Sequence, residues 1–318
     1  MRRVLLVLLV VSVLVLPLLL VLGHERVPEK PRVALIEITG TIADSSSASP
    51  WSDLSTGARE VIEHLRTAQE DPRFAAVVVR INSGGGSPAA AQEIYQAIRQ
   101  VRANNKPVVA SMGDVAASAA YYIASAADKV VANPSTLTGS IGAIMEVFIV
   151  EDLMERFGVE AETIVSGRYK DAGSPYRPLS PEERAHFQEL VNDVLDQFIS
   201  DVAQGRGMDV ETVRAVADGR VFSGRQALAL GLVDHLGGLE DAVSIAAELA
   251  GIEERPVVVP LRRERSWYDR LLGAVATALV RAGLGHAAGL WSIESVANGV
   301  PAGNLTPYIP PWGYRLRY

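Results

Sequence analysis

The sequence predicts an α/β fold in which helices flank a largely parallel sheet. Apolar, β-branched runs of strand length, such as 74–82 and 107–112, alternate along the chain with stretches of helical periodicity. A turn rich in glycine or other small residues separates each of these two runs from the helix that follows. Strands that alternate with helices pair in parallel, because each helix carries the chain back to the start of the next strand.

Composition argues against several classes of function. The chain has 318 residues, 48% of them hydrophobic, and a formal net charge of −7, so a large core is expected and nucleic acid is not an expected partner. There is no cysteine, which rules out disulfides, thiolate metal ligands and a cysteine nucleophile. No cluster of histidine and acidic residues has metal-ligand spacing, so we expect neither a metal site nor a cofactor.

A membrane anchor is predicted at the N-terminus. Residues 4–22 contain no charge, and their length is close to the roughly 20 residues that a membrane-spanning helix needs. Arg2 and Arg3 place residues 1–3 in the cytoplasm, and therefore place the chain after residue 23 outside it. A removed signal peptide, cleaved after residues 21–23, is the alternative. Residues 23–31 form a polar linker to the domain.

The predicted domain, 32–250, begins with three strand–helix steps. A strand at 32–39 and a polar loop at 44–55 precede a helix at 56–70, whose apolar residues share one face. The following elements are a strand at 74–82, a glycine-rich turn at 83–87, a helix through 92–99, a strand at 107–112, a helix that begins near Ser118, and a strand at 130–132.

The second half of the domain is predicted to be mainly helical. Ser180 and Glu183 form a capping box with Pro181 at the first helical position, and this pattern predicts a long helix to about residue 204. The other expected elements are an apolar run at 143–150, a strand at 160–165, a polar loop at 166–175, a short helix from a second capping box at 223–226 to Gly231, and a helix at 239–250. Residues 251–318 are expected to be an extension that packs on the domain, on a partner subunit or at the membrane surface. Disorder of the last 20 or so residues is the alternative.

Ser118 is the candidate nucleophile. It follows an apolar strand and the glycine at 113, and alanines flank it on both sides at the predicted start of a helix. A nucleophile needs a reachable hydroxyl on a fixed backbone, and a tightly packed helix behind it provides that. The alternative is a small-residue helix packed closely against the sheet, with Ser118 as its N-cap.

Lys170 is the candidate general base. The Gly-x-Ser-x-Gly motif is absent, and none of the five histidines lies in a glycine-rich setting. A lysine base must be neutral, which requires its pKa to fall from about 10.4 towards 7. Of the four lysines, only Lys170 lies in a loop rich in glycine and serine, where Arg168 would favour the neutral form and Asp171 would oppose it. The alternative is an ordinary loop lysine.

The glycine-rich turn at 83–87 is a candidate oxyanion site. Its backbone N–H groups lie between a buried strand and a helix, where a peptide can approach closely, and the Ala119 N–H after Ser118 is a natural second donor. Such a turn could instead bind phosphate, but the Rossmann and Walker patterns are both absent.

Four motifs resemble the signal peptide peptidase A family, whose members are membrane-anchored bacterial serine peptidases related to Clp protease and the crotonases. In chain order they are RINSGGGS (80–87), AASAAYYI (116–123), NPSTLTGSIG (133–142) and SGRYKD (166–171). The resemblance runs from about residue 33 to 250.

The resemblance implies a Clp protease/crotonase-like fold of repeated ββα units and a dyad of Ser118 and Lys170. It also implies that Ser140 orients the lysine and that Gly85 or Gly86 supplies an oxyanion donor. Two departures stand out: Ala119 and Ala120 replace two glycines that usually follow the nucleophile, and Gly84 replaces a usual proline.

The expected function is therefore that of a membrane-anchored serine endopeptidase in the cell membrane, with its catalytic domain outside the cytoplasm. Released signal peptides and other short apolar peptides are the expected substrates, and a homo-oligomer is the expected assembly. Two alternatives are an acyl-CoA enzyme of the crotonase type, disfavoured because coenzyme A is lacking outside the cytoplasm, and a catalytically silent scaffold, disfavoured because Ser118 and Lys170 are both present.

Overall fold

The computed structural model of the protein describes residues 30–45 and 55–262. The predicted anchor at 4–22, most of the linker and the extension from residue 263 onward lie outside the described residues. Among the helices that are described, none is both long and apolar enough to cross a membrane.

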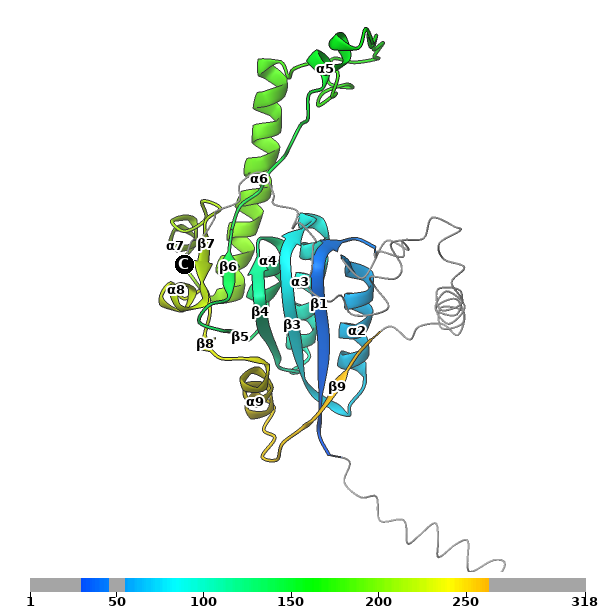
Figure 1. The fold of residues 1–318 in the computed structure, drawn as a ribbon. Coiled ribbons are helices and arrows are strands. Elements are labelled where there is room, and N and C mark those ends of the chain that lie inside the picture. The colour runs from blue at the N-terminus through cyan, green and yellow to red at the C-terminus, as the bar shows by residue number, and fades with distance from the viewer. Residues whose placement is uncertain (1–29, 46–54, 263–318) are drawn as a thin grey trace, which may run out of the picture. The chain divides into compact units, whose positions relative to one another are not determined.

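A parallel sheet forms the centre of the described chain (Figure 1), as the sequence predicted. Its strands lie in the order β2-β1-β3-β4-β5-β8, and every neighbouring pair on this path is parallel. They are β1 (Arg32–Ala43), β2 (Ser55–Gly57), β3 (Phe74–Gly86), β4 (Val108–Ala117), β5 (Lys129–Ala132) and β8 (His235–Leu236). The α/β architecture is thus confirmed.

Three further short strands extend this sheet. β6 (Leu137–Gly139) pairs with the end of β4, and β7 (Val221–Ser223) runs antiparallel to β6. β9 (Val257–Pro260), from the stretch assigned to the extension, pairs with β1. The sequence patterns did not reveal these three strands, because each has four residues or fewer.

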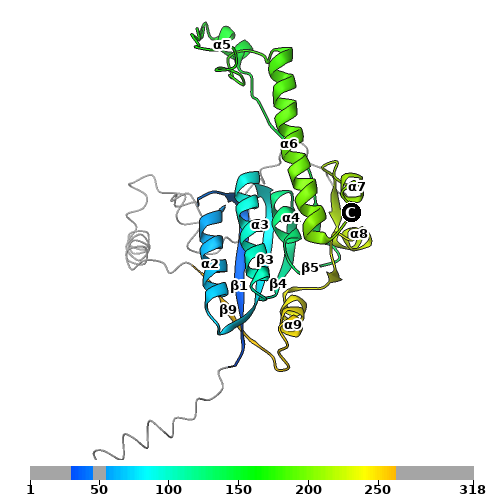
Figure 2. The same ribbon diagram turned by 180° about the vertical axis from the view of Figure 1, so that it is seen from behind.

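Helices cover both faces of the sheet (Figures 1 and 2). α2 (Ala58–Glu70), α3 (Pro88–Ala103) and α4 (Ala119–Ser125) pack on one face, and α9 (Leu239–Leu249) packs on the other. Alternate residues of β3 pack against the helices on the two faces of the sheet, because successive side chains along a strand point to opposite faces. Val77 and Val79 join the cluster with α2, α3 and α4, whereas Ala76 and Val78 join the cluster with α9.

The long helix α6 (Pro181–Arg206) begins and ends as its sequence signals predict. The capping box of Ser180 and Glu183 is formed in both directions, and Gly207 ends the helix with φ 62°. The second capping box likewise starts α8 (Gly224–Ala229), and α7 (Val210–Arg214) lies between the two helices. Only the C-terminal part of α6 packs on the domain, through Phe198 and neighbouring buried residues.

Residues 143–180 form what we call the arm. They run out beside the outer half of α6 and return to its start (Figure 1). The arm contains α5 (Glu151–Arg156), which buries no residue. The prediction of a strand at 160–165 is wrong, because these residues pair with no described strand and are all exposed. Their β-branched pattern therefore lacks the partner that a strand needs for its backbone groups.

Large apolar side chains of the arm are exposed to an unusual degree. Ile144 is 86% exposed, Phe148 76%, Phe157 78% and Ile164 92%. Large apolar side chains exposed in this number make the arm a candidate interaction surface.

Candidate active site

Ser118 is held in a strained conformation at the start of α4. Its φ of 55° and ψ of −125° are unusual for a residue with a Cβ, and such a conformation costs on the order of 1–3 kcal/mol. Two backbone hydrogen bonds hold it: the Ser118 N–H donates to the Gly139 carbonyl at 2.9 Å, and the Tyr122 N–H donates to the Ser118 carbonyl at 3.0 Å. Every residue of α4 behind it is buried.

The Ser118 hydroxyl makes no capping hydrogen bond with α4. Ser118 therefore occupies the N-cap position of the alternative interpretation, but without the side-chain hydrogen bond that would make it a cap. Instead the side chain lines a pocket, and its hydroxyl is left for another partner. Strain of this kind persists where the surroundings impose it, and it clusters at functional sites.

Replacing Ser118 with glycine is expected to stabilise the fold relative to Ser118→Ala. Glycine adopts positive φ without a Cβ clash, so relief of strain outweighs its larger entropy of unfolding by about 1 kcal/mol. Both variants lack the hydroxyl, so the comparison isolates the backbone. Thermal unfolding of the two full-length proteins measures the difference, and a Ser118→Gly protein that unfolds first would contradict the proposed strain.

Gly85 packs directly against Ser118. A Cβ on Gly85 would lie 2.9 Å from the Ser118 Cβ and 3.2 Å from the Ala119 nitrogen, and Gly85 has φ +117°. Its N–H donates to the Ser83 hydroxyl at 3.1 Å, and that hydroxyl donates to the Gly40 carbonyl at 2.5 Å. The missing side chain thus leaves open the space next to the Ser118 side chain and the first N–H of α4.

Gly86 has a different neighbour. A Cβ on Gly86 would lie 2.1 Å from the Ile42 carbonyl oxygen in β1, so the close approach of the two strands requires glycine. Gly86 also lines the pocket together with Ser118 and Ala119.

The two departures from the family pattern have simple structural settings. Ala119 is 5% exposed and Ala120 is fully buried, and both methyl groups belong to the core cluster of α4. Gly84 is exposed, and an added Cβ would meet nothing within 4 Å. Neither departure removes a polar group from the site.

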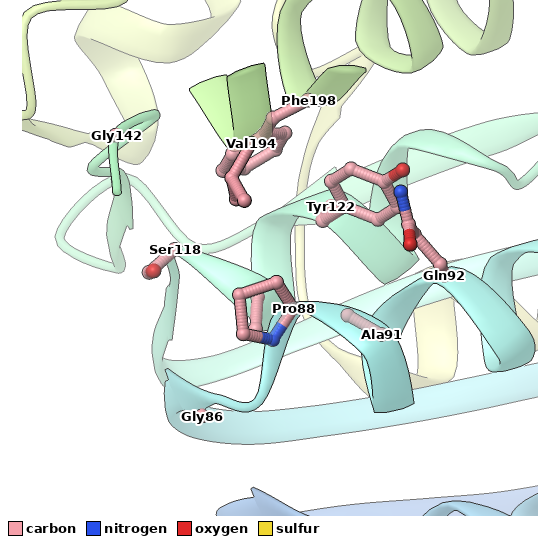
Figure 3. A pocket seen from close by; sticks show the side chains of 10 residues that line it. Gly86, Pro88, Ala91, Gln92, Ser118, Tyr122, Gly142, Val194 and Phe198 are labelled. Atoms are coloured by element: carbon pink, nitrogen blue, oxygen red, sulfur yellow. The ribbon is translucent and has the colours of Figure 1, made fainter. Parts of the chain in front are cut away.

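A small, mostly apolar pocket opens beside Ser118 (Figure 3). Its volume is about 30 Å³, roughly the share of one water molecule in the liquid. Ser118 and Gly142 lie towards one end, and Tyr122 and Gln92 lie at the other. The remaining lining residues come from the end of β3, the starts of α3 and α4, and α6: Gly86, Pro88, Ala91, Ala119, Val194 and Phe198.

Sequence reasoning missed the contribution of α6 to this pocket. Val194 and Phe198 are four residues apart, so they lie on one face of the helix. That spacing was a readable signal for a shared face, but nothing in the sequence indicated that the face meets Ser118.

Ser140 is joined to Ser118 through one backbone hydrogen bond of its neighbour Gly139. It directly follows Gly139, whose carbonyl accepts the Ser118 N–H, and its own N–H donates to the Arg220 carbonyl at 2.9 Å. Like Ser118 it has positive φ, at 51°. The predicted role of Ser140 in orienting a lysine stays a prediction.

Lys170 lies elsewhere. It is exposed in a turn of the arm, where its backbone N–H donates to the Gly167 carbonyl at 2.9 Å, and it is not among the residues that line the pocket. Within one chain the structure therefore brings together five of the six predicted site residues: Gly85, Gly86, Ser118, Ala119 and Ser140. Among the described residues, no group of histidine and acidic side chains could hold a metal ion.

Comparisons with known proteins identify the fold and the family of this chain. The model of peptidase family S49 matches residues 100–253, and the model of the Clp protease family matches residues 53–138. Together they cover the strands and helices that surround Ser118, and the second match identifies the fold as Clp protease-like.

Individual relatives are also similar. A putative protease of Synechocystis is 43% identical over 224 residues, which are 70% of this chain and 76% of the relative. The putative signal peptide peptidase SppA of Enterococcus faecium is 35% identical over 69% of this chain and 64% of its own length.

The chloroplastic serine protease SPPA of Arabidopsis thaliana is 34% identical over 79% of this chain, but only 37% of that protein is covered. The chain thus spans less than two thirds of the length of the Arabidopsis and Enterococcus relatives. Taken together, the matches show that this chain belongs to peptidase family S49, the serine peptidase family of signal peptide peptidase A.

Proposed function

We infer that this protein is a membrane-anchored serine endopeptidase in which Ser118 is the nucleophile and Lys170 of a neighbouring copy is the general base. The observation that carries the proposal is the setting of Ser118. Its hydroxyl makes no capping hydrogen bond with α4, its backbone is strained and fixed, and it lies beside a glycine turn, a helix N-terminus and a pocket.

The chemistry follows from this setting. Neutral Lys170 takes the proton of the Ser118 hydroxyl, and the Ser118 oxygen attacks the carbonyl of the scissile bond. The developing oxyanion accepts hydrogen bonds from backbone N–H groups. Lys170 then returns the proton to the leaving amine, and water hydrolyses the acyl-enzyme by the same base.

The oxyanion donors that we propose are Ala119 and Gly86. Ala119 is the first residue of α4, so its N–H has no acceptor within the helix. Gly85 was an equal candidate from sequence, but its N–H already donates to Ser83. Gly86 lines the pocket with Ser118, which favours it as the second donor. Gly85 then acts by leaving space for the carbonyl.

A homo-oligomer completes the proposed site. Lys170 is exposed on the arm, and the same arm exposes large apolar side chains such as Phe148 and Ile164. Burial of these side chains against a second copy would be favourable, at about 25 cal/mol per Å² of apolar surface. We propose that the arm of one copy packs on its neighbour and places Lys170 at the neighbour's Ser118. This contact would also cover the unpaired segment 160–165.

The proposed substrates are short apolar peptides, including released signal peptides. The pocket beside Ser118 is narrow and mostly apolar, which suits a small side chain next to the scissile bond. The name of the Enterococcus relative agrees with this substrate class. The charge-free segment 4–22 would anchor the protein in the cell membrane, with the catalytic domain outside the cytoplasm.

Covalent labelling tests the proposed nucleophile. The full-length protein in detergent is treated with a fluorophosphonate, and the modified residue is located by peptide mass spectrometry. We expect one adduct, on Ser118, and no adduct on Ser83 or Ser140. A preparation that cleaves peptides while Ser118 stays unmodified would contradict the proposal.

Widening the pocket is expected to change specificity. Val194→Ala removes two methyl groups from its α6 wall. Because a methylene in an apolar pocket is worth about 1–3 kcal/mol, kcat/KM for peptides with leucine before the scissile bond should rise about tenfold relative to those with alanine. Leu249→Ala, an exposed position on α9, is the matched control. An unchanged leucine-to-alanine ratio in Val194→Ala would exclude this pocket as the specificity site.

A further inference from the structure

The turn that carries Lys170 is tied to α6 by a chain of ion pairs. Arg177 donates through Nε to the Asp171 carboxylate at 2.9 Å. It also donates through its two terminal nitrogens to both oxygens of Glu183, at 2.6 and 2.9 Å. The Glu183 side chain is 4% exposed, that of Asp171 17% and that of Arg177 35%. A planar guanidinium is suited to this fork because it binds two carboxylates at fixed angles.

Glu183 is itself fixed at the start of α6. One of its carboxylate oxygens accepts the Ser180 N–H at 2.9 Å, and its own N–H donates to the Ser180 hydroxyl at 3.2 Å. The chain of contacts therefore runs from the capping box of a long helix, through Arg177, to Asp171. Asp171 is the residue that directly follows Lys170, so Arg177 restricts where the Lys170 backbone can lie.

The same contacts pair the charges of Asp171 and Glu183 with that of Arg177. Hydrogen bonding to Arg177 lowers the pKa of Asp171 and holds that of Glu183 at about 2, so both carboxylates are ionised at neutral pH. Other charged or titratable groups of this region include Arg168, Tyr169, Tyr176, Glu182 and His186. The Arg168 guanidinium lies 4.9 Å from the centroid of the Tyr169 ring, and the centroids of the tilted rings of Tyr169 and His186 lie 5.5 Å apart. Without Arg177, the carboxylate of Asp171, the residue next to Lys170, would lose its cationic partner. We expect that an uncompensated negative charge there would disfavour the neutral lysine that a base requires.

We propose that Arg177 is a positioning residue for catalysis: it fixes the Lys170 turn on α6 and neutralises Asp171, the residue that directly follows the general base. The proposal rests on the proposed role of Lys170 as that base. It assigns Arg177 no contact with substrate.

The pH dependence of kcat/KM in the full-length protein tests this role. Arg177→Met is expected to lower kcat/KM about tenfold to a hundredfold, because the base is misplaced. It should also move the midpoint of the rising acid limb up by about 0.5 pH unit at low salt. Adding Asp171→Asn to Arg177→Met should move the midpoint back down without restoring the full rate. In 1 M salt, where the screening length is about 3 Å, the shift should shrink.

Two further variants separate charge from geometry. Arg177→Lys keeps the positive charge but cannot bind both carboxylates at fixed angles. The midpoint of its pH profile should therefore stay near that of the unmodified protein, while kcat/KM falls. Arg214→Met is the matched control, because Arg214 of α7 forms an exposed ion pair with Asp196 of α6 and is not among the residues that line the pocket. It should leave both the rate and the midpoint unchanged.

Each outcome decides the proposal. A fall in rate with an unchanged midpoint in Arg177→Met would mean a merely structural role and overturn it, as would unchanged kinetics. If Arg177→Met does not fold, Asp171→Asn alone is expected to lower the midpoint, and an unchanged midpoint there overturns the proposal. Lys170→Ala separates this failure from failure of the proposed function. If the Lys170→Ala protein is active, Lys170 is not the general base. If it is inactive while Arg177→Met has normal kinetics, only the positioning role of Arg177 is refuted.

Discussion

Replacing Gly85 with alanine is expected to lower kcat/KM about a thousandfold in a chain that still folds. The added methyl group would lie 2.9 Å from the Ser118 Cβ and 3.2 Å from the Ala119 nitrogen. That space is where a substrate carbonyl must approach the hydroxyl and the first N–H of α4. Neither neighbour can yield, because one belongs to a strained backbone and the other to a buried helix.

The adjacent glycine provides the control for this substitution. Gly84→Ala places the same methyl group in open space, so its rate and stability should match those of the unmodified protein. Gly85→Ala will lose some stability, since its φ of +117° disfavours a side chain. Steady-state kinetics and thermal unfolding of both variants separate the two effects. A folded Gly85→Ala protein with normal kcat/KM would refute the proposed position of the substrate carbonyl.

Replacing Lys170 with alanine is expected to lower kcat by about a thousandfold or more, because general-base catalysis contributes up to about 10⁴-fold. Lys170→Arg should be equally inactive, since a guanidinium stays protonated at any accessible pH. Lys30→Ala, which removes an exposed lysine of the linker, should keep the full rate. These are kcat measurements on full-length protein with a short apolar peptide.

The same base predicts how the rate depends on pH. A neutral lysine is needed, so kcat/KM should rise with pH as the lysine loses its proton. For an active enzyme near neutrality the midpoint must lie well below 10, the ordinary lysine range. A midpoint at an ordinary lysine value would contradict burial of the base in the assembled site.

The sequence predicted those helices and strands whose ends or burial depend on residues close together in the chain. The capping box at Ser180 defined the start of α6 because its two hydrogen bonds join residues three apart in sequence. The strand at 74–82 was readable because β3 is buried on both faces and is therefore apolar throughout much of its length.

Structural features that depend on residues far apart in the chain could not be predicted from the sequence. The strain at Ser118 depends on the Gly139 carbonyl, which lies in a three-residue strand. The choice between Gly85 and Gly86 as oxyanion donor depends on the Ser83 hydroxyl. The pattern at 160–165 has the composition of a strand, but composition does not supply a pairing partner.

Mixing two inactive variants tests the central claim most directly. Ser118→Ala retains Lys170, and Lys170→Ala retains Ser118, so neither alone should cleave peptides. If each site takes Ser118 from one copy and Lys170 from its neighbour, co-expression at equal levels should restore about a quarter of the unmodified activity, because a quarter of the interfaces pair the two intact residues. A co-assembled mixture without activity would contradict a dyad shared between copies.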